Sequence, residues 1–374
     1  MTFEPGTALE FFAGIGLARM GLEKAGWRVV FANDYDPKKQ EMHESHWGPD
    51  ANYKLKSVFA VDSAEVPSAE LAWASFPCVD LSLAGNRAGL SGKDSSAFWG
   101  FADVLSRLHS EGRCPPIVII ENVVGMLTSH GGRDLETILG FLDGMGFSLD
   151  MLEIDAAYFV PQSRARIFIL ATRGPYELPP RSLLFPSPFR PKRIGAYIES
   201  HPGLRWGTAP VGKPPERTST LADIVEHFPA DADIWWPSHA VEKLTSQMSP
   251  RHLAAVNSLT DRDSIAVGTV YRRVRSTGCM AEVRLDGLAG CLRTPRGGSS
   301  KQFVLEMGRG ELRARHMTAI EYGRLQGADD FRVRVPFNQA LFGFGDAVCV
   351  PAVEWLLRNA VEPLRTARVT AANA

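Results

Sequence analysis

The feature that most constrains the fold is a strand, a glycine turn and a helix at the beginning of the chain. Residues 7–12 form an apolar run of strand character, and Gly14 and Gly16 then lead into a helical pattern that Gly26 ends. A second short strand follows at residues 28–32. This succession predicts a doubly wound α/β protein, in which ligands bind at the carboxyl ends of parallel strands.

The second strand ends in an acidic residue, Asp34, which lies twenty residues after Gly14. An acid at about this distance binds the ribose hydroxyls in doubly wound nucleotide-binding folds. The dinucleotide fingerprint G-x-G-x-x-G fails, because Arg19 occupies its third glycine position. A ligand with a ribose and an adenine but no pyrophosphate therefore fits better, although a glycine turn alone can be a plain tight connection.

Chemically reactive side chains follow two later strands. Cys78 comes after the apolar run 71–74 and directly after Pro77, which stiffens the end of that strand. Glu121 follows the fully apolar run 117–120, where a carboxylate is costly unless it is paired or used. These positions favour a functional role for Glu121, whereas Cys78 taken alone is more readily explained as a buried core cysteine.

Two arginines precede the next strand. Arg164 and Arg166 alternate along an extended segment that leads into the apolar run 167–171, so both guanidiniums are expected on one side. Either one can pair with Glu121 and stay charged at any relevant pH. The alternative is an arginine pair that solvates a strand edge.

The chain changes character after Gly174, where prolines become frequent and no helical or strand period is sustained. Residues 181–317 hold 20 Lys and Arg against 13 Asp and Glu, a net charge of +7, while the remainder carries −8. A basic segment beside an acidic one suggests a bound polyanion, although a solvated basic face has the same composition. We predict one domain from residues 1–180 with 318–374, and a second from residues 181–317.

The basic segment contains two arginine-rich clusters that suit contacts with phosphates and guanine edges. The residues expected to bind DNA in these clusters are Arg272, Arg273, Arg275, Arg293, Arg296 and Lys301.

Cysteine spacing and hydropathy constrain the location. The five cysteines are odd in number and never spaced C-x-x-C, so neither a disulfide framework nor a metal site is expected. The amino terminus lacks a basic flank followed by an apolar core, and no apolar run approaches the roughly 20 residues of a membrane span. We therefore expect a cytoplasmic protein without a membrane partner.

Taken in this order, the segments resemble the prokaryotic DNA (cytosine-5-)-methyltransferases. Seven segments match the family's motifs: residues 12–16 (cofactor loop), 33–36 (ribose segment), 76–78 with Ser82 and Gly85 (catalytic loop), 121–123 (ENV motif), 162–166 (arginine motif), 324–327 (late helix) and 345–348 (carboxy-terminal cofactor motif). The resemblance implies a doubly wound, mostly parallel sheet of the S-adenosylmethionine-dependent methyltransferase type. It also implies that residues 181–317 are a smaller, irregular, basic target-recognition domain.

The resemblance implies a covalent mechanism at cytosine. Cys78 would add as a thiolate to carbon 6 and so make carbon 5 nucleophilic. Glu121 would act as a proton donor or hydrogen-bond partner at ring nitrogen 3. Arg166 would orient Glu121 and contact the exocyclic oxygen, and Arg164 would brace the catalytic loop. S-adenosyl-L-methionine would supply the methyl group and leave as S-adenosyl-L-homocysteine.

Cofactor contacts are also implied by the resemblance. Phe12 and Tyr35 would pack on the adenine, Asp34 would bind the ribose hydroxyls, and Asp62 would bind the adenine amino group. The backbone at Gly14 and Gly16 would hold the methionine end. Further implied contacts are Ala13, Ile15, Pro77, Asp346 and Val348. Because Asp346 stands where the family commonly has Asn, we expect its charge to contact the cofactor's ammonium group.

The implied substrate is a cytosine flipped out of a specific sequence in double-stranded DNA, at a cost of roughly a few kcal/mol. Ser82 would contact the DNA. The protein is expected to be a monomer associated with the nucleoid, and the resemblance leaves open whether a cognate restriction endonuclease accompanies it.

Several positions depart from the family pattern: Glu10, Leu17, Val79, Ser163, Ile320 and Ala347. Three alternatives therefore stay in view. An RNA cytosine-5 methyltransferase on the same scaffold is disfavoured by the long basic segment, and a catalytically silent DNA-binding paralogue by the retention of Cys78, Glu121 and Arg166. A nucleotide-dependent oxidoreductase is disfavoured by Arg19.

Overall fold

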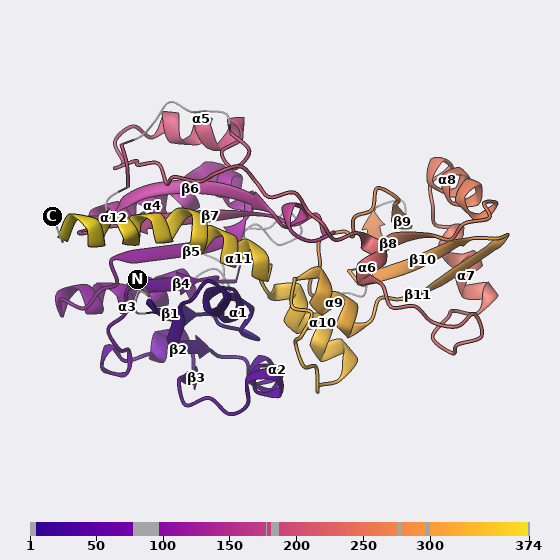
Figure 1. The fold of residues 1–374 in the computed structure, drawn as a ribbon, viewed down its shortest axis with the longest axis horizontal. Coiled ribbons are helices and arrows are strands. Elements are labelled where there is room, and N and C mark those ends of the chain that lie inside the picture. The colour runs from indigo at the N-terminus through magenta and orange to yellow at the C-terminus, as the bar shows by residue number, and fades with distance from the viewer. Residues whose placement is uncertain are drawn as a thin grey trace. The chain divides into compact units, whose positions relative to one another are not determined.

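The computed structural model describes residues 5–77, 97–176, 178–180, 187–275, 278–295 and 300–372. The chain forms two compact units (Figure 1). The first comprises Met1–Asp155, Ala165–Pro214 and Val350–Ala374, and the second comprises Ala156–Arg164 and Pro215–Cys349.

The first unit is built on a seven-stranded sheet in the order β3-β2-β1-β4-β5-β7-β6. Its strands are β1 (Thr7–Phe11), β2 (Arg28–Asp34), β3 (Tyr53–Leu55), β4 (Leu71–Ala74), β5 (Ile117–Val123), β6 (Ser148–Asp155) and β7 (Ala165–Thr172). The strands from β3 to β5 pair in parallel, and β7 runs antiparallel to both β5 and β6. The predicted doubly wound, mostly parallel sheet is confirmed, and its strand order reverses between β1 and β4.

Helices cover both faces of this sheet, which explains why β5 is apolar without alternation. They are α1 (Leu17–Lys24), α2 (Pro37–Trp47), α3 (Ala97–Ser110), α4 (Arg133–Gly144), α5 (Lys192–Ser200), α11 (Val350–Leu356) and α12 (Glu362–Ala372). One continuous core joins α3, α4 and α5 to the strands, while α11 and α12 cross in front of the sheet in Figure 1.

Two arginine–carboxylate pairs attach the segment around α5 to strand β6. Arg190 Nε donates to Asp150 Oδ1 at 3.0 Å, and Arg193 Nε donates to Glu153 Oε2 at 2.5 Å. These long-range pairs place residues 187–214 in the first unit, whereas the sequence assigned residues 181–214 to the second domain. The expectation of no sustained helix in this stretch is wrong at α5.

The second unit contains a four-stranded antiparallel sheet in the order β11-β10-β8-β9. Its strands are β8 (Ala266–Arg275), β9 (Gly278–Arg284), β10 (Gln302–Gly308) and β11 (Glu311–His316), and its helices are α6 (Leu221–Ile224), α7 (Ser238–Thr245), α8 (Pro250–Thr260), α9 (Ala319–Leu325) and α10 (Phe337–Asp346). Leu244 of α7 and Val256 of α8 share a core with Val270, Phe303 and Leu305. The prediction of an irregular domain is therefore wrong.

Helices α9 and α10 belong to the second unit, whereas the sequence placed them in the catalytic domain. A fully buried ion pair between Arg315 of β11 and Glu321 of α9 accounts for part of this difference, with Nη2 and Oε1 2.5 Å apart. Gln326 Nε2 then donates to the carbonyl of Phe344 in α10 at 2.7 Å. The spacing of hydrophobic residues in the sequence cannot reveal such polar contacts.

One stretch, Phe337–Ala367, is long and apolar enough to cross a membrane by length and composition, contrary to the sequence-based expectation. However, 67% of its most apolar window is buried inside the structure, and α10 and α11 are separate helices within it. The core helices of a folded domain pass the same test.

Close packing of α1 on α11 requires a glycine at position 21. A Cβ there would lie 2.5 Å from Val353 Cβ and 2.8 Å from the carbonyl oxygen of Val350. We expect Gly21→Ala to lower the free energy of unfolding by about 1–3 kcal/mol, because the helices must separate. Gly140→Ala in α4 is the matched control, since a Cβ there meets nothing within 4 Å, and it should be neutral or stabilise by up to about 1 kcal/mol. Equal effects in urea unfolding would contradict the packing argument.

Candidate active site

The reversal of strand order between β1 and β4 marks the expected ligand crevice of this sheet. The loop after β1 is the glycine turn, and the segment after β4 is Ser75–Phe76–Pro77. The rings of Phe12 and Phe76, one from each loop, lie with centroids 6.2 Å apart. The two segments singled out from the sequence therefore meet at the switch point.

The glycine turn has an unusual backbone. Phe12, Gly14 and Gly16 have φ angles of 60°, 56° and 82°. These angles lie in the left-handed region, which residues with a Cβ rarely adopt. A Cβ on Gly16 would lie 2.6 Å from Trp47 Nε1, so this position also needs glycine for space. The strained conformation of Phe12 is the kind of backbone outlier that gathers at binding sites.

Asp34 holds the turn in place. Its Oδ2 accepts the Gly14 N–H at 2.9 Å and its Oδ1 accepts the Asp36 N–H at 3.0 Å. The Tyr53 hydroxyl adds a bond to the Gly14 carbonyl at 3.0 Å. Each carboxylate oxygen of Asp34 keeps a second lone pair for a ligand hydroxyl, and the neighbouring Tyr35 leaves 63% of its surface exposed.

Asp62, which was predicted to bind the adenine amino group, also stabilises a turn of its own chain. It is exposed, and its Oδ1 accepts the Ala64 N–H at 3.0 Å, which caps a short 3₁₀ turn.

Asn122 connects the ends of β4 and β5, a role that the sequence did not reveal. Ala74 of β4 pairs with Ile120 of β5, and Asn122 Nδ2 donates to the Phe76 carbonyl at 3.4 Å. The chain that leads to Cys78 therefore runs beside Glu121. Cys78 and Ser82 themselves lie outside the described residues.

Glu121 and Arg166 form an ion pair at the carboxyl end of β5. Val123 pairs with Arg166 across the ladder, so Glu121 and Arg166 lie diagonally on the same face, with Arg166 Nε 3.2 Å from Glu121 Oε1. Both side chains are largely buried. Of the two predicted partners of Glu121, the structure selects Arg166.

Arg164 bonds instead to main-chain carbonyls of the second unit. Its Nη1 donates to the Leu292 carbonyl at 2.8 Å and its Nη2 to the Ala347 carbonyl at 2.5 Å. Gln162 accepts the Leu292 N–H at 3.0 Å and donates to the Leu325 carbonyl at 2.6 Å. Arg164 therefore braces the backbone around the exposed Asp346 and the buried Val348.

The predicted DNA-binding residues differ in their surroundings. Arg272 donates to Gln247 Oε1 at 3.0 Å and covers the ring of Phe303, so it closes a core. Arg273 and Arg293 are exposed, and Lys301 Nζ donates to Asn338 Oδ1 at 2.9 Å. The side chain of Arg275 and all of Arg296 lie outside the described part of the chain.

A buried carboxyl group, Glu10, lies under the glycine turn. Its Oε1 accepts the Arg19 N–H at 3.1 Å, and burial raises its pKa to about 8. Burial also lowers the pKa of the nearby His43 to about 4. Both groups are therefore uncharged at neutral pH. An acid inside an otherwise apolar strand was the available signal, although Glu10 was predicted only to be a departure from the family pattern.

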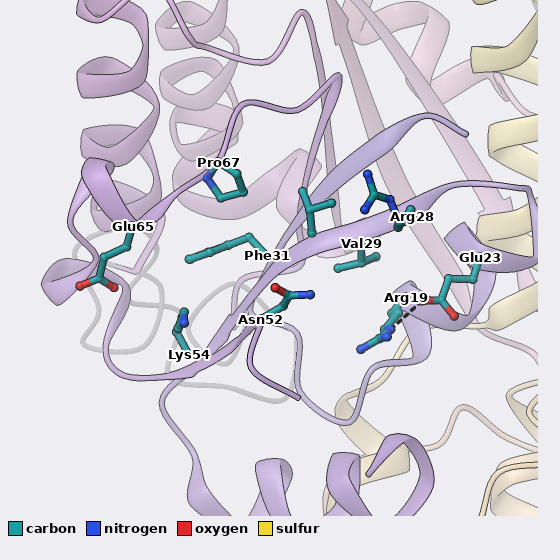
Figure 2. A pocket seen from close by; sticks show the side chains of 10 residues that line it. Arg19, Glu23, Arg28, Val29, Phe31, Asn52, Lys54, Glu65 and Pro67 are labelled. Carbon is teal, nitrogen blue, oxygen red and sulfur yellow. Dashed lines mark hydrogen bonds and ion pairs between the residues drawn. The ribbon is translucent and has the colours of Figure 1, made fainter. Parts of the chain in front are cut away.

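A hollow of about 540 Å³ lies beside the amino-terminal half of β2 (Figure 2). Arg19, Arg28 and Lys54 bring positive charge to its wall, and Glu23 and Glu65 bring negative charge. Among the described residues, none of those predicted to bind the cofactor lines this hollow.

Comparisons with known proteins identify the family. A sequence model of the C-5 cytosine-specific DNA methylase family matches residues 6–362, so the chain belongs to this family. Type II methyltransferase M.NgoBI of Neisseria gonorrhoeae is 24% identical over 92% of this chain and 90% of its own length. Type II methyltransferase M.HpaII of Haemophilus parainfluenzae is 25% identical over 96% of this chain and 90% of its own.

Solved structures show the same fold. The S. pombe Dnmt2 methyltransferase superposes with a TM-score of 0.60 at 17% identity, and covers 96% of this chain and 99% of its own. The Entamoeba histolytica methyltransferase EhMeth has a TM-score of 0.56 at 13% identity, with 97% and 99% coverage. The chain is an S-adenosylmethionine-dependent DNA cytosine-5 methyltransferase, and the RNA and oxidoreductase alternatives find no support in its family.

Glu10 should impose a pH dependence on stability. The unfolded chain releases this proton near pH 4.5, whereas the folded protein keeps it to about pH 8, so rising pH favours unfolding between these values. We expect the wild type to lose about 1.4 kcal/mol per pH unit relative to Glu10→Gln across this window. Urea unfolding from pH 5 to 8 measures the difference.

The difference between the wild type and Glu10→Gln isolates the contribution of Glu10, because both proteins contain His43. The lowered pKa of His43 makes the free energy of unfolding rise with pH below pH 6.5, which is opposite to the effect of Glu10. Glu136→Gln on the exposed face of α4 is the control and should follow the wild type. Parallel profiles for the wild type and Glu10→Gln would show that the carboxyl group is charged in the folded protein.

Proposed function

We propose that this enzyme methylates carbon 5 of a cytosine that is flipped out of a specific sequence in double-stranded DNA, through a covalent adduct with Cys78. The observation that carries this proposal is the buried Glu121–Arg166 pair at the end of β5, beside the chain that delivers Cys78. Acid, cation and nucleophile then come from neighbouring strand ends of one sheet.

Addition of the Cys78 thiolate to carbon 6 moves electron density into the ring and makes carbon 5 nucleophilic. Glu121 meets that density at ring nitrogen 3, as a proton donor or hydrogen-bond partner. Arg166 fixes the orientation of Glu121 through their 3.2 Å contact and contacts the exocyclic oxygen. Once carbon 5 carries the methyl group, its proton is lost to solvent and the thiolate departs, which restores the aromatic ring.

The residues of the glycine turn fit a cofactor with a ribose and an adenine. Asp34 offers its remaining lone pairs to the ribose hydroxyls, and the exposed ring of Tyr35 packs on the adenine with Phe12. The positive φ angles at Gly14 and Gly16 open the backbone toward the methionine end. When bound, S-adenosylmethionine supplies the methyl group. Further contacts in this proposal are Ala13, Ile15, Asp62, Pro77, Asp346 and Val348.

Exposed cations of the second unit support double-stranded DNA as the substrate. Arg273, Arg293 and Lys301 contact the duplex together with Arg275, Arg296 and Ser82, and these contacts offset the cost of flipping with a salt-sensitive affinity. The names of the type II relatives support a modification enzyme with a cognate restriction endonuclease. We propose that it acts as a monomer on cytoplasmic DNA.

The test is bisulfite sequencing of DNA from cells that express the protein. The wild type should leave 5-methylcytosine at one sequence motif, and Cys78→Ala should leave none. Duplexes with 5-fluorocytosine at that motif should trap a covalent complex, because fluorine cannot leave as the proton does. Glu121→Gln should slow trapping at least tenfold. Absence of 5-methylcytosine at every motif would refute the proposed function.

The charge of Asp346 should strengthen cofactor binding. This residue is exposed in the segment that Arg164 braces, so we expect Asp346→Asn to weaken S-adenosylmethionine binding roughly two- to fivefold at low salt, and less at high salt. Calorimetric titration measures this, with Asp330→Asn as an exposed control in the same unit. Unchanged affinity across salt concentrations would exclude a charge role for Asp346.

A further inference from the structure

The peptide between Gly14 and Ile15 is held by a side chain from β3. The hydroxyl of Tyr53 donates to the Gly14 carbonyl at 3.0 Å. Tyr53 leaves only 6% of its surface exposed, and burial raises the pKa of its hydroxyl, which therefore stays protonated at neutral pH. On the other side of Gly14, Asp34 Oδ2 accepts the Gly14 N–H at 2.9 Å. Two different strands therefore fix the two peptide groups that flank Gly14.

The bond from Tyr53 matters because residue 14 is a glycine. Gly14 has a φ angle of 56°, and glycine populates positive and negative φ about equally well. Without a further bond, the peptide that follows Gly14 would turn over at little cost. The hydroxyl of Tyr53 removes this freedom, so one hydrogen bond decides the orientation of the peptide.

Tyr53 is itself anchored by its neighbours. It pairs with Ala32 in the ladder between β2 and β3, and Asn33 Nδ2 donates to the carbonyl of the next residue, Lys54, at 3.1 Å. The ring centroid of Tyr53 lies 4.6 Å from that of His43, which is completely buried. The hydroxyl therefore reaches Gly14 from a fixed position.

The same peptide carries a main-chain donor that the turn does not use. The N–H of Ala13 donates to the Asn33 carbonyl and that of Gly16 to the Ala13 carbonyl, both at 2.9 Å, and the N–H of Gly14 is bonded to Asp34. Within the part of the chain that the structure describes, the N–H of Ile15 has no hydrogen-bond partner. A main-chain donor withdrawn from water is costly without an acceptor, so this N–H is suited to a ligand.

The direction of this donor follows from the bond to Tyr53. A planar trans peptide points its C=O and its N–H in opposite directions. Because the Gly14 carbonyl faces Tyr53 of β3, the Ile15 N–H points away from β3. In the strand order β3-β2-β1-β4, the crevice between β1 and β4 lies on that side. Tyr53 therefore turns a free donor toward the ligand crevice.

We propose that Tyr53 is a positioning residue for S-adenosylmethionine, and that it orients the Ile15 N–H to donate to the carboxylate of the cofactor's methionine group. A carboxylate oxygen forms a charge-assisted hydrogen bond with a main-chain N–H, which is stronger than a neutral one. Tyr53 does not touch the cofactor and acts only through the peptide between Gly14 and Ile15. The assignment rests on the proposed contact between the glycine turn and the methionine end of the cofactor.

The experiment is a calorimetric titration of the full chain with two ligands, S-adenosylmethionine and its decarboxylated analogue, which lacks only the carboxylate. The wild type should bind S-adenosylmethionine more tightly than the analogue. Tyr53→Phe keeps the ring and removes the hydroxyl, so it should weaken binding of S-adenosylmethionine about three- to tenfold, the effect of one hydrogen bond. It should bind the analogue as the wild type does, because the analogue has no carboxylate for the Ile15 N–H.

Tyr176→Phe is the matched control in the same unit. Tyr176 is also buried, and its hydroxyl donates to Glu70 Oε1 at 2.6 Å, directly before β4 at the amino end of that strand. This variant should keep the wild-type affinity for both ligands. Urea unfolding without ligand shows that each variant is folded. In steady-state kinetics, Tyr53→Phe should raise the KM for S-adenosylmethionine and leave kcat unchanged, whereas a loss of folded protein would lower kcat.

The outcomes are distinct. If Tyr53→Phe binds S-adenosylmethionine as tightly as the wild type, or weakens both ligands equally, Tyr53 does not act on the carboxylate. If the wild type binds both ligands equally, the glycine turn does not hold the carboxylate, which contradicts the proposed cofactor contact itself. Failure of the wild type to methylate any DNA would instead contradict the proposed function and leave the binding comparison intact.

Discussion

The site depends on the direction of one strand. Because β7 runs antiparallel to β5, its first residues lie at the carboxyl end of the sheet, where parallel strands deliver only their last residues. Arg166 thereby reaches Glu121, and a carboxylate that would be costly to bury alone gains a permanent cation. The same edge receives the chain after β4 through Asn122. Removal of one charge would leave the other buried, so the pair constrains both strands together.

The second unit places buried polar side chains among the apolar residues around its motif segments. Arg164, Gln162 and Gln326 bond to main-chain carbonyls, and Arg315 pairs with Glu321 without solvent contact. Hydrogen bonds from side chains to main-chain carbonyls fix the position of a segment whatever its hydrophobicity. They fix the backbone around Asp346, while its side chain stays exposed.

Local patterns predicted the first unit well, since the strand, glycine turn, helix and acid at Asp34 are all sequential features. The sequence could not decide between Arg164 and Arg166 as the partner of Glu121, because that choice depends on the register of β5 with β7. It also misplaced residues 187–214, which ion pairs from Arg190 and Arg193 attach to β6. The strands of the second sheet were missed because arginines interrupt their apolar alternation, as at Arg272.

The position of Arg272 at the end of a core has an evolutionary consequence. The buried Val270 before it contributes to the core of the second unit, whereas Val274 leaves 68% of its surface exposed. Substitutions at Val274 therefore carry little folding cost, and the protein can sample them neutrally. Sequence changes at this exposed position can therefore accumulate faster than changes in the core beside it.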